Sequence, residues 1–130
     1  MAREGNLIVP GLTAPESILP VLTGSGCECA QVSDLVRLPD AGIPLRCRIG
    51  FVDPQTGEDR ILTLTQSEED PGDPWEDDDD PVDRYEGAVT LLSIGAHGCG
   101  LRLLQDLASR LGGRYQDDGD PEATQTYPVP

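Results

Sequence analysis

The stretch Glu68–Asp80 constrains the fold of this chain more than any other, because nine of its residues are acidic and none is basic. Such a run cannot bury enough apolar surface to offset the entropy lost on ordering, and its like charges repel one another. It therefore cannot belong to a core. The sequence predicts an extended, solvated loop over residues 68–80, with the folded body on either side of it.

An apolar stretch follows shortly after, and it predicts the centre of that body. Residues Glu86–Ile94 are apolar on both faces over most of their length, which is typical of a strand inside a sheet. Three glycines in Gly95–Gly100 end the strand in a tight turn. Leucines then recur at helical spacing from Leu101 to Leu111, and Gly112 stands where a C-terminal cap belongs. A packed helix is therefore expected over residues 101–111.

A β-hairpin is predicted over residues 44–65. From Leu45 to Phe51, apolar residues alternate with polar ones, which is the period of a strand with one face on the core. Asp53–Gly57 has the composition of a turn, and Arg60–Thr65 alternates again. These two strands are expected to pair.

The remaining segments predict shorter elements. Thr13 and Glu16 have the spacing of a capping box, so a helix is expected to begin at Thr13 and to be short or kinked at Pro20. Strands are expected over residues 6–9, 29–38 and 113–117, and residues 118–130 as a loose tail docked only by Tyr127. Together these elements predict a single α+β domain over residues 1–130, with an antiparallel sheet, one main packed helix and an acidic surface loop.

The composition is strongly acidic, which limits the partners that the chain can bind. Asp and Glu number 24 against nine basic residues, all of them arginine, and the formal net charge is -15. Nucleic acids and anionic membranes would be repelled, whereas a basic protein would be attracted. No apolar run approaches the roughly 20 residues of a membrane span, and the N-terminus lacks the apolar region of a secretory signal. A cytoplasmic location is expected, with no direct nucleic-acid or membrane ligand.

The cysteines and the histidine give little support to a metal site or a catalytic thiol. Cys27 and Cys29 are expected on one strand face with one residue between them, whereas zinc-binding pairs usually have two to four. Cys47 shares the phase of the apolar residues in its strand and is expected in the core. His97 stands two residues before Cys99 in a glycine-rich turn, where it need not face the thiol. We therefore expect reduced thiols, no bound metal and no cofactor.

Recognition of a basic partner is the function that the acidic run fits best. A dense negative loop can steer a basic protein towards itself and pair with its Arg or Lys side chains. The run lacks the glycine and glutamate positions of a calcium-binding loop, and one shared solvated environment cannot differentiate carboxylates for acid-base catalysis. The predicted partner-binding residues are Glu68, Glu69, Asp70, Asp73, Trp75, Glu76, Asp77, Asp78, Asp79 and Asp80.

The C-terminal half of the chain resembles a known family. Tyr85–Ala88 begins an apolar strand, Ile94–Gly100 reads Ile-Gly-Ala-His-Gly-Cys-Gly, and Gly-Gly-Arg-Tyr follows at 112–115. Behind an acidic segment that contains Trp75, this order resembles the SUKH superfamily. Members commonly serve as immunity proteins, which bind and neutralise a cognate bacterial toxin, often a nuclease. The resemblance implies that function here, although the helical stretch 101–111 differs from the strand that members have.

Three functions of different classes follow, in order of preference. The first is a non-enzymatic acidic binding protein, most concretely an immunity protein that neutralises a cognate toxin. The second is a phage or plasmid nucleic-acid mimic that inhibits a DNA- or RNA-binding host protein. It would need acidic residues spaced along one face at phosphate-like separations, rather than gathered in one loop. The third and least favoured is a zinc or thiol enzyme.

Overall fold

The computed structural model describes residues 3–38, 43–72, 79, 83–120 and 123–129. For residues 35–38 and 43–45 it describes the backbone only. The described chain forms one seven-stranded antiparallel sheet and two helices, which confirms the predicted α+β class. In chain order the elements are β1 (Glu4–Pro10), α1 (Pro15–Gly24), β2 (Glu28–Leu38), β3 (Ile43–Val52), β4 (Asp59–Ser67), β5 (Val89–Gly95), α2 (Gly100–Leu111), β6 (Gly113–Asp117) and β7 (Gln125–Tyr127). No helix in this part of the chain is long and apolar enough to cross a membrane.

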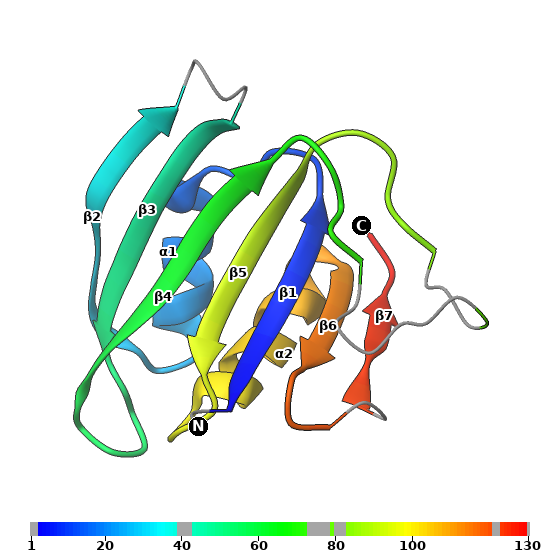
Figure 1. Cartoon of the computed structure of the whole chain (residues 1–130). Coiled ribbons are helices and arrows are strands. Elements are labelled where there is room, and N and C mark those ends of the chain that lie inside the picture. The colour runs from blue at the N-terminus through cyan, green and yellow to red at the C-terminus, as the bar shows by residue number, and fades with distance from the viewer. Residues whose placement is uncertain (1–2, 39–42, 73–78, 80–82, 121–122, 130) are drawn as a thin grey trace.

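The strands follow the order β2-β3-β4-β5-β1-β6-β7 across the sheet (Figure 1). Strands β2 to β5 form a meander in which each strand pairs with the next. The first strand of the chain, β1, lies between β5 and β6 and is antiparallel to both. Without β2 and β3, which lie between α1 and β4 in the chain, the elements β1 to β6 follow the β-α-β-β-α-β order of ferredoxin-like folds. Strands β2 and β3 extend the sheet beyond β4, and β7 extends it beyond β6. The first strand of the chain therefore lies between two strands from the second half of the chain.

Both helices lie on the same face of the sheet, and the core lies between them and the strands (Figure 1). Leu7, Leu64 and Leu92 are neighbours across three strands and are fully buried. Leu104 and Leu107 of α2 are also fully buried, which confirms the helical spacing read from the leucines. Burial of such side chains contributes roughly 1.5–3 kcal/mol each relative to exposure.

The predicted hairpin and central strand are confirmed. Register between β3 and β4 closes the hairpin with Val52 opposite Asp59. Cys47, Ile49 and Phe51 are buried, as the alternation predicts. Strand β5 is the middle strand of the seven, as predicted.

The capping box predicted at Thr13 is wrong. The N-cap of α1 is Ala14, whose side chain makes no cap hydrogen bond, and Pro15 is the first helical residue. The N–H of Thr13 donates instead to Thr90 Oγ1 on β5 at 2.8 Å. Contacts with the sheet therefore decide where the helix begins. The helix α1 continues through Pro20 and is a second packed helix beside α2.

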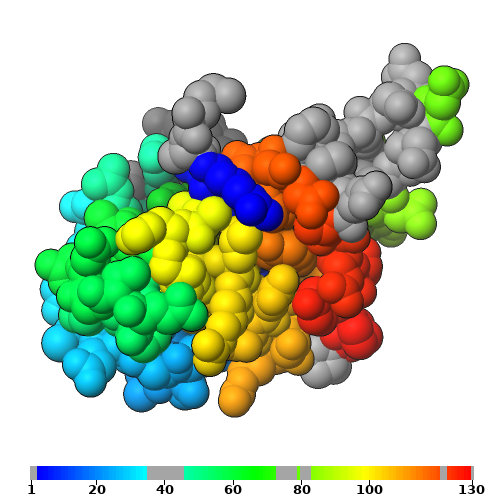
Figure 2. Space-filling view, turned by 90° about the horizontal axis from the view of Figure 1, so that it is seen from below, coloured from blue at the N-terminus to red at the C-terminus, as the bar shows by residue number. Residues whose placement is uncertain are grey.

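The tail predicted to be loose is partly ordered, because β7 adds to the edge of the sheet. Gly113 pairs with Tyr127, and Tyr115 pairs with Gln125. At the opposite end of β6, Arg3 forms an ion pair with Asp117. Figure 2 shows the start of β1 lodged between the turn after β5 and the end of β6. Both termini of the described chain are thus attached to β6.

Candidate functional site

One carboxylate near the start of the acidic segment Glu68–Asp80 is buried and not solvated. Asp70 is 5% exposed and accepts hydrogen bonds from both terminal nitrogens of Arg114, at 2.6 and 2.8 Å. Arg114 lies on β6 and is 3% exposed. The prediction of Asp70 as a partner-binding residue is therefore corrected, because its carboxylate is fully used inside the protein.

The same carboxylate joins the two ends of the acidic segment. Asp70 also accepts hydrogen bonds from the backbone N–H of Gly72 at 2.8 Å and of Tyr85 at 3.0 Å. Arg114 donates to the carbonyl oxygen of Asp83 at 3.2 Å, and Gln116 donates to that of Gly72 at 2.8 Å. Both ends of the segment are thus attached to β6. We call these contacts the anchor: Asp70, Gly72, Asp83, Tyr85, Arg114 and Gln116.

The electrostatics of the anchor favour the ionised carboxylate. Burial alone would raise the pKa of Asp70, but the hydrogen bonds from Arg114 and from the Tyr85 and Gly72 amides hold this pKa at about 2. The guanidinium also lies 5.7 Å from the centroid of the Tyr85 ring. Two buried atoms, Tyr85 Oη and Arg114 Nε, have no hydrogen-bond partner among the described residues. The anchor thus buries two polar groups whose hydrogen bonds are not made within the described residues.

Exposed acidic side chains surround the anchor. Within the described residues, Glu68, Glu69, Asp79, Asp83 and Glu86 are all exposed. A polar groove of about 550 Å³ lies here, lined by Glu69, Asp70, Pro71, Arg84, Tyr85 and Gly87. The other predicted site residues lie outside the described part of the chain: Asp73, Trp75, Glu76, Asp77, Asp78 and Asp80.

Three buried carboxylates in this structure are each paired with an arginine. Each pair cancels one negative and one positive charge, so the formal charge of -15 rests on the residues that remain. The pairs are Asp70–Arg114, Asp53–Arg60 and Asp117–Arg3.

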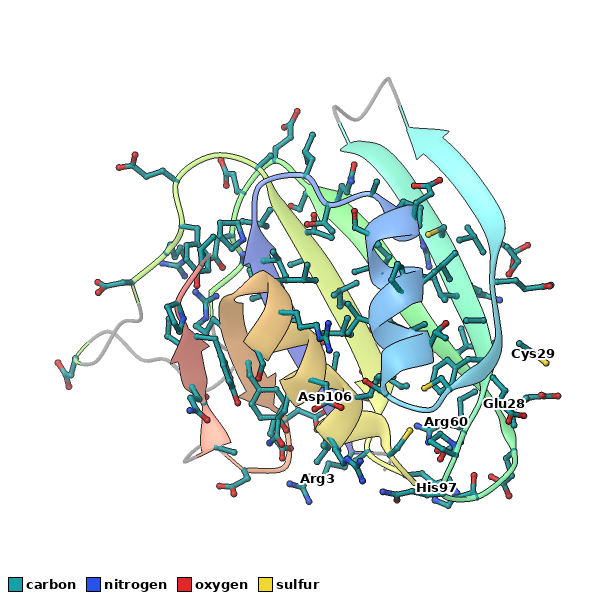
Figure 3. The ribbon with its side chains drawn as sticks, turned by 180° about the vertical axis from the view of Figure 1, so that it is seen from behind. Arg3, Glu28, Cys29, Arg60, His97 and Asp106 are labelled. Carbon is teal, nitrogen blue, oxygen red and sulfur yellow. The ribbon has the colours of Figure 1, made fainter. Side chains whose placement is uncertain are left out.

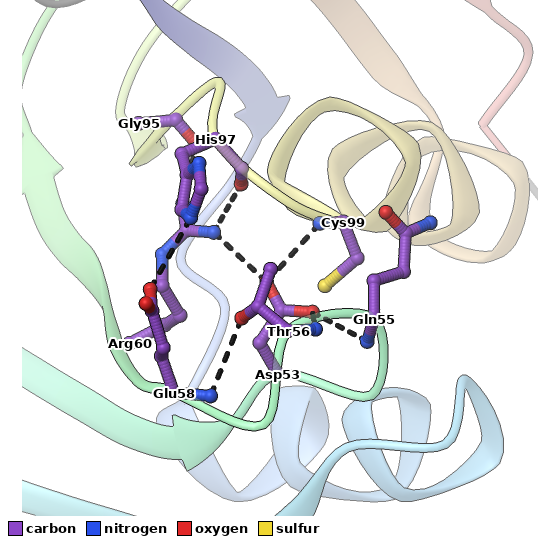
Figure 4. A network of polar contacts seen from close by, with 8 residues as sticks. All are labelled: Asp53, Gln55, Thr56, Glu58, Arg60, Gly95, His97 and Cys99. Carbon is purple, nitrogen blue, oxygen red and sulfur yellow. Dashed lines mark hydrogen bonds and ion pairs between the residues drawn. The ribbon is translucent and has the colours of Figure 1, made fainter.

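Asp53 organises a second polar cluster, at the β3–β4 turn (Figure 4). Its carboxylate is fully buried and accepts hydrogen bonds from the N–H groups of Gln55 at 2.7 Å and Cys99 at 3.1 Å. Arg60 donates to the same carboxylate at 2.9 Å and to the carbonyl oxygen of Gly95 at 2.6 Å. The cluster thus joins the hairpin turn to the glycine-rich turn before α2.

This second cluster does not have the arrangement of a catalytic thiol. Burial and the nearby Asp53 carboxylate raise the pKa of Cys99 to about 12, whereas a nucleophilic cysteine needs a lowered pKa. His97 lies at the surface, with Nε2 3.2 Å from Glu58 Oε2. The histidine and Arg60 occupy the same end of the molecule (Figure 3). Their contacts hold the turn together.

The cysteines are distributed differently from the prediction. Cys27 is buried and Cys29 is exposed, so the two do not share one buried face. Figure 3 shows Cys29 pointing away from the body at the edge of the sheet. Cys47 is buried in the core as predicted, and Cys27 and Cys99 line the same small cavity. Among the described residues, no group of three or more His, Cys, Asp and Glu side chains is placed to hold a metal ion.

Sequence reasoning missed Arg114 as the residue that fixes the acidic segment. Its signal was a lone arginine in the middle of a short predicted strand, Gly113–Asp117, beside Tyr115. A charge in a strand that becomes fully buried needs a partner. The chain offers 24 acidic candidates, and only the fold selects Asp70.

Comparison with known proteins adds no family. The chain matches no protein-family model, no curated protein and no solved structure. The functional argument therefore rests on the residues and their geometry.

Proposed function

We propose that this chain is a non-enzymatic acidic binding protein that recognises a basic protein through the segment between β4 and β5. The partner class is a cognate toxin, and the chain would act as its immunity protein. The resemblance of Tyr85–Gly100 to the SUKH superfamily supports this choice of partner. The observation that carries the proposal is the anchor, which holds the described residues on either side of the acidic run, near Gly72 and Tyr85, to the body of the domain.

The distribution of charge supports a basic partner. Three arginines, Arg3, Arg60 and Arg114, are each paired with a buried carboxylate. They therefore do not neutralise the carboxylates at the surface. Exposed acidic residues lie at both ends of the segment, with Glu68 and Glu69 at its start and Glu86 near its end. Clustered charge of one sign raises the local concentration and the association rate of an oppositely charged partner.

The anchor also lowers the cost of binding. A free acidic tether would lose conformational entropy when a partner orders it. Here the backbone next to Gly72 and Tyr85 is already fixed by hydrogen bonds to Asp70.

The test is a comparison of two charge-neutralised variants. The first variant, D77N/D78N/D79N/D80N, removes four charges from the acidic segment. The matched control, E4Q/E16Q/E28Q/D59N, removes four exposed charges from other elements. Both are titrated calorimetrically with the purified product of the neighbouring gene, at 50 and at 300 mM salt.

The proposal predicts that only the first variant loses affinity, by about tenfold or more at low salt, with a smaller loss at high salt because salt screens exposed charges. Circular dichroism should show that both variants stay folded. Equal affinity of the two variants, or failure of the wild-type protein to bind, would contradict the proposal.

A further inference from the structure

We propose that Cys27 and Cys99 form an intramolecular disulfide when the protein meets a hydroperoxide, tying the segment between α1 and β2 to the start of α2. This oxidation site is separate from the acidic segment and does not depend on the proposed function.

Both thiols are held beside one small cavity by fixed backbone. Cys27 follows α1, and its N–H donates to the carbonyl oxygen of Leu22 at 3.0 Å. Cys99 is the N-cap of α2, and its N–H donates to the buried carboxylate of Asp53 at 3.1 Å. The residues are 4% and 5% exposed, belong to the same core cluster, and line the same small cavity. The two side chains therefore lie near each other in the core.

A small cavity lies beside the pair. It has a volume of about 10 Å³ and is lined by both cysteines, with Pro54 and Arg102 among the other residues. A cavity of this size admits roughly one water-sized molecule. Hydrogen peroxide is therefore favoured over a bulky disulfide such as oxidised glutathione, which cannot enter without opening the structure.

The environment of the two thiols assigns their order of reaction. Burial raises the pKa of Cys27, and a hydrogen bond with Cys99 opposes that rise. Beyond burial, the carboxylate of Asp53 raises the pKa of both thiols, and at Cys99 a hydrogen bond with this carboxylate raises the pKa further, to about 12. Cys27 is thus the thiol that more readily becomes a thiolate, which is the reactive form, and Cys99 is the resolving thiol.

The chemistry balances with hydrogen peroxide as the oxidant. The Cys27 thiolate attacks one peroxide oxygen, the O–O bond breaks, and the sulfur becomes a sulfenic acid while hydroxide leaves and takes up a proton. The sulfur of Cys99 then attacks the sulfenic sulfur of Cys27, and a second water leaves. Two thiols and one peroxide therefore give one disulfide and two waters.

The experiment maps the disulfide in the folded wild-type protein, so it does not depend on a core variant that might fail to fold. The protein is treated with hydrogen peroxide, denatured, alkylated and digested, and its peptides are identified by mass spectrometry. We expect a cross-linked peptide pair carrying Cys27 and Cys99, about 2 Da lighter than the two reduced peptides together. Cys47 should be alkylated, and Cys29 should react without joining the cross-link.

Two further measurements complete the test. The C29S variant changes only the exposed thiol and should give the same cross-link at the same yield. The oxidised protein should melt about 5–15 °C higher than the reduced protein, because a long loop is closed. Alkylation of both Cys27 and Cys99 after treatment, a cross-link through Cys29, or oxidation of Cys27 to sulfinic acid without a cross-link would overturn the proposal.

Discussion

Asp70 and Arg114 lie 44 positions apart in the chain and form a buried ion pair, with Arg114 Nη2 2.6 Å from Asp70 Oδ1. Arg114 lies on β6, near one edge of the sheet, whereas Asp70 follows β4 on the other side of β1. The pair therefore holds the start of the acidic segment against a strand that forms much later in the chain. Tyr85, bonded to the same carboxylate, brings back the far end of the segment.

Replacing one member of this pair should strongly destabilise the fold. R114M leaves the Asp70 carboxylate buried without its partner and should lower the free energy of unfolding by about 3–5 kcal/mol. The control is R48Q, which breaks an exposed pair with Asp34 and should cost less than about 1 kcal/mol. Urea denaturation measures both values.

The double variant D70L/R114M separates charge burial from packing. It removes both charges from the same place and should recover part of the stability lost in R114M. If R114M costs no more than R48Q, the buried pair does not have the role that its geometry assigns.

Stability should also depend on pH through Asp70. Its pKa is about 2 in the folded protein, against an ordinary value of 3.8, because the hydrogen bonds from Arg114 and the backbone outweigh burial. The unfolded chain therefore takes up a proton first as the pH falls. The contribution to stability is fully present above pH 4, and about 2 kcal/mol of it is lost as the pH falls from 4 towards 2.

The measurement is urea denaturation at several pH values between 2 and 6. D70N should show a shallower fall than the wild-type protein over this range. The pKa values of Asp53 and Asp117 are also lowered, so the stability of D70N should still depend in part on pH. E16Q, which changes an exposed carboxylate on α1, should retain the wild-type slope, and a D70N slope equal to that of E16Q would contradict the assignment.

Two glycines with similar backbone angles should respond differently to alanine. Gly57 has φ +72° and open space where a Cβ would stand, so G57A should cost only about 1 kcal/mol of backbone strain. Gly98 has φ +62°, and its added Cβ would clash with Asp53 Oδ2. G98A should cost about 2–4 kcal/mol, because it also disturbs the bonds around Asp53. Urea denaturation measures both losses. If G57A and G98A lose the same free energy of unfolding, the contact with Asp53 is unimportant.

The elements that could be predicted from sequence are those decided by neighbouring residues. Alternation from Leu45 to Phe51 gives β3, and leucine spacing gives α2, because each pattern reports one buried face. The start of α1 could not be predicted, since Thr13 bonds to Thr90 on β5 and not to its own helix. β7 was missed for a similar reason, because three residues with little apolar character become a strand only when β6 offers an edge.

In the candidate site, too, neighbouring residues predict some features and contacts distant in the sequence decide others. Exposure of Glu68, Glu69 and Asp79 agrees with the expectation for an acidic run. Asp70 stands beside them in the sequence, yet it is buried, because Arg114 compensates its charge. A run of identical charges gives no local sign of which member will find an internal partner.

The central claim is that the acidic segment attracts a basic partner, and the association rate constant tests it most directly. Stopped-flow mixing with the purified product of the neighbouring gene, at ionic strengths from 20 to 300 mM, gives this constant for the wild-type protein, for D77N/D78N/D79N/D80N and for the control E4Q/E16Q/E28Q/D59N. We predict that the wild-type rate falls steeply with salt, that the control keeps most of this dependence, and that the segment variant is slower and less sensitive to salt. The same rate and salt slope for the segment variant and the wild-type protein would contradict the claim.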